Sequence, residues 1–269
     1  GKSIMNAVLW VLKDTLSSCG AGDDGSTCHM SVFSAISPWA EALLFWSGSK
    51  LSGRNIRITS VDFNPCILDN IPSEAIAECL PTLDLVERSG HSFDLTVSYS
   101  GIEHDGLGRY GDPVNPNGDM SAMKEMWLLT RPNGILLVAV PCNAENHQPR
   151  SRIPIWGNGK IQVLQHRAYG AERYMRLIIG WELEGFVVNG GKVSGRKPGE
   201  TKISVIARML HCSFRVGEGQ PLLILRKQDN MTFHDVLLEG DNWTGNIASQ
   251  FEEDYNRLVA LSSGNVTCT

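Results

Sequence analysis

Residues 93–118 read FDLTVSYSGIEHDGLGRYGDPVNPNG and join an apolar run to a polar, glycine-rich loop. The first seven residues mix apolar and β-branched side chains without glycine or proline, which is typical of a strand buried on both faces of a parallel sheet. Six ionisable side chains then follow within ten residues: Glu103, His104, Asp105, Arg109, Tyr110 and Asp112. Because open α/β sheets bind ligands at the carboxyl ends of their strands, this loop is the candidate active site.

The composition of the loop excludes a core segment and a regular helix. Its charged groups would lose hydration on burial without enough partners. Glycine stands at positions 101, 106, 108 and 111, a spacing that opposes helix formation.

The bulk composition is that of a soluble globular enzyme. Of 269 residues, 42% are hydrophobic and 20% charged, enough to bury a full core in one large domain or a domain with an extension. The net charge of -5 argues against a nucleic-acid partner, which needs clustered Lys and Arg. We also expect no membrane span, because no apolar run is long enough.

The seven cysteines show no CxxC motif and no paired Cys/His spacing, which argues against a structural zinc site or any other metal site. Four of them lie in or beside apolar runs and are expected to be reduced, buried thiols: Cys66, Cys79, Cys142 and Cys212. An odd number favours a reducing compartment, so we expect a cytoplasmic protein. The missing initial Met leaves a removed upstream targeting segment open.

Three N-x-[ST] sequons begin at Asn230, Asn242 and Asn265. Chance alone would give about two, so the sequence by itself lends N-glycosylation little support.

The residues before the loop alternate between helical and strand patterns. We expect helices at 4–16, 37–48 and 67–80, and strands at 30–34, 56–63 and 83–86. Ser37 fits the N-cap of the second helix and Pro38 its first position.

The residues after the loop continue the alternation. Asp119 is expected to cap a helix at 120–129, followed by a fully apolar strand at 135–140. Further elements are expected as a strand at 160–165, a helix at 169–183, a terminal hairpin of 202–210 with 221–227, and a helix within 247–261. The whole pattern predicts an α/β, Rossmann-like, doubly wound and mostly parallel seven-stranded sheet with a C-terminal antiparallel hairpin.

Across residues 30–227 the order of elements and three motifs resemble the class I S-adenosylmethionine (SAM)-dependent methyltransferase superfamily. The motifs are SVDFNP around Asp62, the loop SGIEHDGLGRYGDP, and LTRPNGILLVAVP. More narrowly, that loop, NPNGDMSAMKEMW and QHRAYG resemble an uncharacterised methyltransferase-like family, domain of unknown function family 268. The resemblance implies an N-terminal helix and loop at 1–28, a methyltransferase-like domain at 29–228 and a C-terminal extension at 229–269.

The resemblance also implies roles for particular residues. The cofactor SAM would be bound by Ser34, Ala35, Ser37, Asp62, Phe63, Ser100 and Gly101. Catalysis would fall to His104 as general base, with Glu103 and Asp105 beside it. The acceptor would be bound by Arg109, Tyr110, His166 and Arg167.

Each of these roles has an alternative. Asp62 is equally suited to a plain strand-end acid or to the ribose contact of a dinucleotide enzyme. The charges of the loop could serve only to hold it together, with Arg109 paired to an aspartate, and His166 and Arg167 could anchor it. SAISPW also replaces the usual glycine-rich turn after the first strand.

Three functions follow in order of preference. The first is a SAM-dependent methyltransferase acting on a small molecule or a sugar hydroxyl. The second is a catalytically silent domain of the same fold that binds or scaffolds. The third, an NAD-dependent oxidoreductase, is disfavoured because no G-x-G-x-x-G follows a strand. The acceptor and the oligomeric state stay open.

Overall fold

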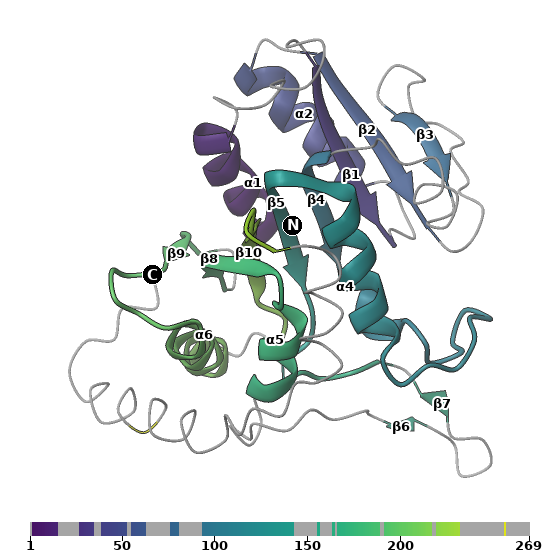
Figure 1. Cartoon of the computed structure of the whole chain (residues 1–269), viewed down its shortest axis with the longest axis vertical. Helices are drawn as coiled ribbons and strands as arrows, with labels where there is room; N and C mark the ends of the chain where they lie inside the picture. Colours follow the sequence, from purple (N-terminus) through teal and green to yellow (C-terminus); the bar gives the residue numbers. More distant parts are fainter. Residues whose placement is uncertain are drawn as a thin grey trace.

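Eight strands form the central sheet, in the order β3-β2-β1-β4-β5-β10-β8-β9 (Figure 1). The structure, a computed structural model, describes residues 2–15, 27–34, 39–52, 55–62, 76–80, 93–142, 155–156, 163–164, 166–188, 191–216, 219–231 and 256. The strands of the sheet are β1 (Thr27–Phe33), β2 (Asn55–Val61), β3 (Ile76–Leu80), β4 (Phe93–Tyr99), β5 (Thr130–Ala139), β8 (Trp181–Val187), β9 (Ser194–Gly195) and β10 (Leu222–Lys227). No helix within the described ranges is long and apolar enough to cross a membrane.

The first five strands of the sheet run parallel, and the last ones reverse. β3, β2, β1, β4 and β5 pair in parallel, whereas β10 lies antiparallel between β5 and β8. β9 adds only two residues at the edge. The predicted fold class, a mostly parallel α/β sheet with an antiparallel C-terminal part, is confirmed.

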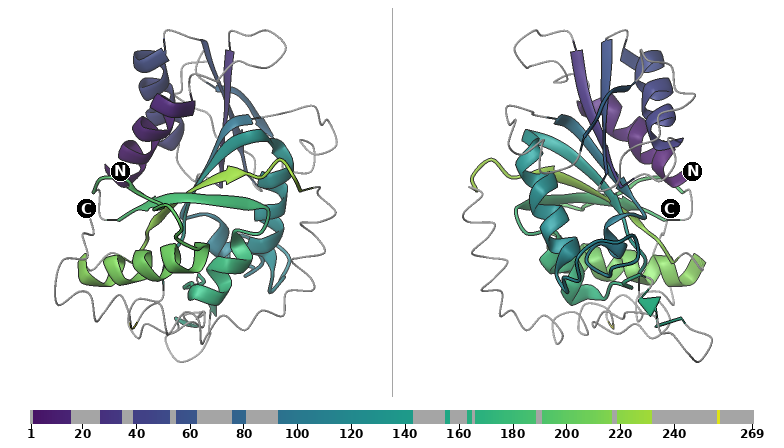
Figure 2. Two further views of the ribbon diagram at one scale, coloured as in Figure 1. Left: turned by 60° about the vertical axis from the view of Figure 1, so that its left-hand side comes forward. Right: turned by 90° about the vertical axis from the view of Figure 1, so that its right-hand side faces the viewer.

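Helices cover both faces of the sheet (Figure 2). Within the described residues they are α1 (Lys2–Thr15), α2 (Trp39–Ser52), α4 (Gly118–Leu129), α5 (Ala171–Leu177) and α6 (Lys202–Val216), with a 3-10 turn, η1 (Ile102–His104). Alternate residues of β5 divide the core in two. Ile135 and Leu137 pack with α1 and α2, while Leu136 and Val138 pack with α4, α5 and α6. This period of two is expected of a strand buried on both faces.

Several predicted elements are confirmed: the first helix, the strands that became β1, β2, β4, β5 and β10, and the helix α4. α2 continues to Ser52 beyond the expected stop at Gly48. A Cβ at Gly48 would lie 1.8 Å from Ile56 Cδ1, so this glycine permits close packing on β2 and does not end the helix.

Other predicted elements are wrong. Residues 76–80 form β3 and not the end of a helix, and 202–210 are helical as part of α6. The β-branched residues Ile203, Val205 and Ile206 imitate a strand, although Ser204, Arg208 and His211 recur at helical spacing along α6. The antiparallel partner of β10 is therefore β8 and not residues 202–210.

The predicted helix at 169–183 is shorter, because Gly180 adopts a left-handed φ of 81° and Trp181 then begins β8. Of the strand expected at 160–165, the structure describes residues 163–164, which form β7 (Val163–Leu164) and pair with β6 (Ile155–Trp156) outside the main sheet. The strand at 83–86 and the helix within 247–261 were predicted for segments outside the described residues, apart from residue 256.

The cysteines depart from expectation. Cys142 is a free, buried thiol as predicted, but Cys212 is disulfide-bonded, as is Cys28. The prediction of a reduced Cys212 is therefore wrong. Cys66 and the side chain of Cys79 lie outside the described part of the chain.

Candidate active site

The connections of the sheet change direction between β1 and β4. β1 leads through α2 to β2 on one side, whereas β4 leads through α4 to β5 on the other. α2 and α4 belong to the two separate core clusters and so cover opposite faces. The carboxyl ends of β1 and β4 thus form a topological switch point, the place where open α/β sheets bind ligands.

A serine follows each of these two strands in the same unusual conformation. Ser34 has φ 57° and Ser100 has φ 58°, both in the left-handed region that non-glycine residues seldom adopt. The N–H of Ser34 donates to Val61 O at 2.8 Å, and the N–H of Ser100 donates to Ala139 O at 3.0 Å. Each conformation costs about 1–3 kcal/mol, and such strain is concentrated at functional sites.

Ser34 therefore adopts a backbone turn that usually requires glycine, although serine has a side chain. Gly101 packs directly against it, since a Cβ at Gly101 would lie 2.5 Å from Ser34 Cβ. Asp62, one residue beyond β2, is half-buried at the same edge of the sheet. The structure thus brings Ser34, Asp62, Ser100 and Gly101 to one edge of the sheet. Ala35, Ser37 and Phe63 lie outside the described residues.

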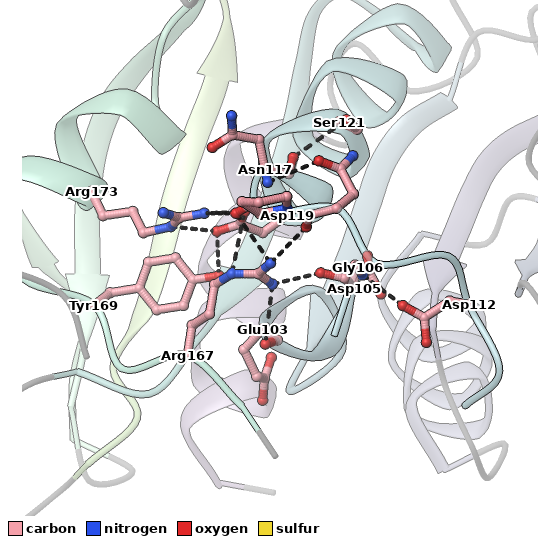
Figure 3. Close-up of polar contacts among 12 residues, drawn as sticks. Glu103, Asp105, Gly106, Asp112, Asn117, Asp119, Ser121, Arg167, Tyr169 and Arg173 are labelled. Carbon is pink, nitrogen blue, oxygen red and sulfur yellow. Dashed lines mark hydrogen bonds and ion pairs between the residues drawn. The ribbon is translucent and has the colours of Figure 1, made fainter. Parts of the chain in front are cut away.

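The loop after Ser100 is held from behind by Arg167 (Figure 3). This guanidinium is buried and donates to the carbonyl oxygens of Asp105 at 2.6 Å, Asn115 at 3.1 Å, Pro116 at 3.2 Å and Glu103 at 3.4 Å. The backbone N–H of Arg167 also donates to Glu103 O at 3.0 Å. The hydrogen bonds of Arg167 therefore go to the loop backbone. Of the two roles considered for this residue, acceptor binding and anchoring of the loop, this geometry favours anchoring.

Asp112 folds the far half of the loop. Its carboxylate accepts the backbone N–H groups of Gly106 at 2.6 Å, Tyr110 at 3.2 Å and Gly108 at 3.3 Å. Burial acts to raise the pKa of Asp112, but these backbone hydrogen bonds outweigh it and lower the pKa below its ordinary value.

Asp119 was expected to cap α4, and this prediction is wrong. The N-cap is Asn117, and the Asp119 side chain is fully buried. Its carboxylate accepts hydrogen bonds from the Tyr169 hydroxyl at 2.8 Å and from Arg173 Nε at 2.8 Å, and it lies 3.7 Å from Arg167 Nε (Figure 3). Asp119 is the buried anion that joins α4 to the start of α5.

Two acids of the loop hold protons at unusually high pH. Glu103 is 1% exposed; its Oε1 accepts from Ser100 Oγ at 2.6 Å, while Oε2 is buried and makes no hydrogen bond within the described residues. Burial raises the pKa of Glu103 to about 7, a rise that the Ser100 hydrogen bond reduces only in part. Burial and the neighbouring carboxylates, Asp112 first, raise the pKa of Asp105 to about 7.

His104 stands beside Glu103, and its side chain is 12% exposed. Its Nε2 lies 3.8 Å from Glu103 Oε1, and its Nδ1 lies 3.3 Å from Arg109 Nη1. The ring makes edge contacts with Tyr110 at 5.6 Å and His166 at 6.2 Å between centroids. The structure thus gathers four predicted residues, His104, Arg109, Tyr110 and His166, into one cluster. Burial, together with the positive charge of Arg109, lowers the pKa of His166.

Sequence reasoning missed two parts of the site. Tyr169 precedes α5 and Arg173 lies within it; both are partners of Asp119 from at least fifty residues away in the sequence, and no local pattern pairs them with it. Glu41 is buried in α2 and accepts from Ser60 Oγ at 2.5 Å, one residue before the end of β2. Burial raises the pKa of Glu41. A lone acid within the apolar run WAEALLFW was its signal.

The raised pKa of Glu103 predicts a pH-dependent stability. The ordinary pKa is 4.5 and the folded value about 7, so between these the folded state binds a proton that the unfolded state lacks. The stabilisation is complete below pH 4.5 and is lost as pH rises through 7. Glu103→Gln should therefore reduce the fall in unfolding free energy between pH 5 and pH 8 by about 2–3 kcal/mol, measured by urea unfolding. Glu172→Gln, at a partly exposed glutamate of α5, is the control; equal pH profiles for all three proteins would contradict the prediction.

Comparison with known proteins gives a family. No curated protein sequence matches the chain. Among solved structures, the 1,6-didemethyltoxoflavin-N1-methyltransferase of Burkholderia thailandensis is 14% identical, with 84% of this chain and 78% of that chain covered and a TM-score of 0.49. The N-methyltransferase NodS of Bradyrhizobium japonicum, solved with S-adenosylhomocysteine, is 13% identical, with 82% and 85% covered and a TM-score of 0.42. A family model described as "Caenorhabditis protein of unknown function, DUF268" matches residues 31–227, well over half of the sequence, and the chain belongs to this family.

Proposed function

We propose that the chain is a SAM-dependent methyltransferase acting on a small molecule or a sugar hydroxyl. The observation that carries the proposal is the meeting of Ser34, Gly101 and Asp62 at the carboxyl ends of neighbouring parallel strands, at the switch point of the sheet. The nearby loop supplies groups that can accept a proton.

The residues present fit the cofactor. Because Gly101 has no side chain, the turn after β4 can pack directly against Ser34 at the end of β1. The left-handed conformation of Ser34 gives a tight backbone turn that a ligand can approach closely. Asp62 would hold the ribose hydroxyls, while the backbone of Ser34 and Gly101 would border the methionine part. When bound, the cofactor supplies an electrophilic methyl group.

The chain's own residues would position the acceptor and remove its proton. Arg167 and Asp112 fix the loop, and this limits the freedom of the groups it carries. His104 would accept the proton from the acceptor hydroxyl. The Glu103 carboxylate, 3.8 Å from His104 Nε2, would stabilise the imidazolium that forms.

A catalytically silent binding domain is the second candidate, and the absence of a glycine-rich turn after β1 favours it. The conformation of Ser34 weakens that argument, because the backbone makes the glycine-like turn without glycine. An acid at the position of Asp62 can also bind the ribose of a dinucleotide, so the experiment must distinguish SAM binding from NAD binding.

Titration with S-adenosylhomocysteine tests the proposal. Asp62→Asn should weaken binding about 10- to 150-fold, since a hydrogen bond to a charged group contributes about 1.5–3 kcal/mol. Isothermal calorimetry on the wild type and the variant measures this loss. Asp229→Asn is the matched control, because exposed Asp229 pairs with Asn133 far from the switch point. Equal affinity in all three proteins would remove Asp62 from the site, and tighter binding of NADH would favour the dinucleotide function.

A further inference from the structure

Two disulfide-bonded cysteines in the core favour an oxidising environment for the chain. Cys28 lies in β1 and Cys212 in α6, and both are disulfide-bonded. They belong to the core clusters on opposite faces of the sheet, so each is bonded to a different cysteine. Disulfides persist in the lumen of the secretory pathway and are rare where glutathione keeps thiols reduced.

The same lumen contains the enzyme that glycosylates N-x-[ST] sequons. A chain in this compartment can therefore be glycosylated at its sequons, although their number alone does not exceed chance. The sequon Asn230-Met231-Thr232 is the one whose acceptor asparagine the structure describes. Asn230 is exposed and lies in the turn directly after β10. Glycan acceptors are expected on such surface turns.

The turn holds Asn230 in a defined position. The N–H of Gln228 donates to Gly180 O at 3.1 Å, and the Asp229 carboxylate accepts the N–H of Asn133 at 2.9 Å. On the other side, Met231 packs against the core. Asn230 thus stands in solvent between two anchored neighbours.

The surroundings of Asn230 can accept a sugar. Asn230 borders a cavity of about 390 Å³ whose wall includes Met175, Ile179 and Lys202. Apolar and polar groups together suit the two faces of a pyranose ring. Because β10 runs antiparallel to β5, its end lies at the amino end of β5, opposite the switch point. A glycan at this position would leave the candidate active site open.

We propose that Asn230 carries an N-linked glycan. The bond that forms joins Asn230 Nδ2 to the anomeric carbon of an oligosaccharide. The bond that breaks joins this carbon to the diphosphate of a lipid-linked donor, and the displaced amide proton leaves with the diphosphate. The modification is independent of methyl transfer.

The test uses the full chain isolated from its own cells without reductant. Treatment with peptide N-glycosidase F in heavy-oxygen water should convert Asn230 into labelled aspartate, detected by mass spectrometry of the peptide that contains it. In the same cells, Asn230→Gln and Thr232→Ala should each remove one glycan from the chain, seen as equal gains in electrophoretic mobility. The serine-retaining change Thr232→Ser should keep the glycan.

An unlabelled Asn230 overturns the proposal, whether the other two sequons are occupied or not. Free thiols at Cys28 and Cys212 together with an unlabelled Asn230 would also overturn its basis, the oxidising environment. Labelled Asn230 in a chain that binds no S-adenosylhomocysteine would support the glycan and reject only the proposed function.

Discussion

Replacing His104 by alanine should lower the rate of methyl transfer about 10²- to 10⁴-fold, the usual contribution of a general base. Affinity for S-adenosylhomocysteine should stay within a few-fold, because the proposed cofactor contacts are made by Asp62, Ser34 and Gly101 and not by His104. The rate is measured as transfer of labelled methyl from SAM to a panel of glycans and small hydroxyl compounds.

His166→Ala is the matched control, since its ring contacts that of His104 at 6.2 Å between centroids but is not the proposed base. It should affect the acceptor's KM more than kcat. If His104→Ala is fully active and only the melting temperature falls, the loop charges have a structural role and the catalytic assignment is wrong.

Replacing Asp119 by alanine should lower the free energy of unfolding by about 3–5 kcal/mol, the range observed when one partner of a buried ion pair is removed. The change leaves the half-buried Arg173 and the buried Arg167 without their shared anion and removes the acceptor of the Tyr169 hydroxyl. Asp119→Asn, which retains an acceptor oxygen, should lose less.

Urea unfolding measures both variants. The exposed carboxylate Asp229 gives a control, and Asp229→Ala should stay within about 1 kcal/mol of the wild type. An Asp119→Ala protein as stable as this control would show that the buried network contributes little to the fold.

The parallel part of the fold could be predicted because its strands are marked locally. Residues 93–99 and 135–140 are continuous apolar or β-branched runs, and such runs occur in strands buried on both faces. α6 was misassigned because it begins with the β-branched residues Ile203, Val205 and Ile206, which are typical of strands. The helical spacing of Ser204, Arg208 and His211 was the signal that could have identified it.

The candidate site could be predicted from its charged side chains, because so many of them in one segment must lie near solvent. The charges between Glu103 and Asp112 could not all be buried, and this marked the loop. The left-handed conformations of Ser34 and Ser100 could not be predicted, because serine rarely adopts them and only the neighbouring strands impose them. Asp119 was misassigned because an acid near a helix start resembles a cap, whereas its partners lie fifty residues away in sequence.

A crystal structure of the chain with S-adenosylhomocysteine would show directly whether the switch point binds the cofactor. We expect the ribose hydroxyls within hydrogen-bond distance of the Asp62 carboxylate and the homocysteine part against the backbone of Ser34 and Gly101. We also expect the sulfur to face the loop that carries His104. A ligand bound elsewhere, or no ligand at saturating concentration in a folded chain, would show that the switch point between β1 and β4 is not a cofactor site.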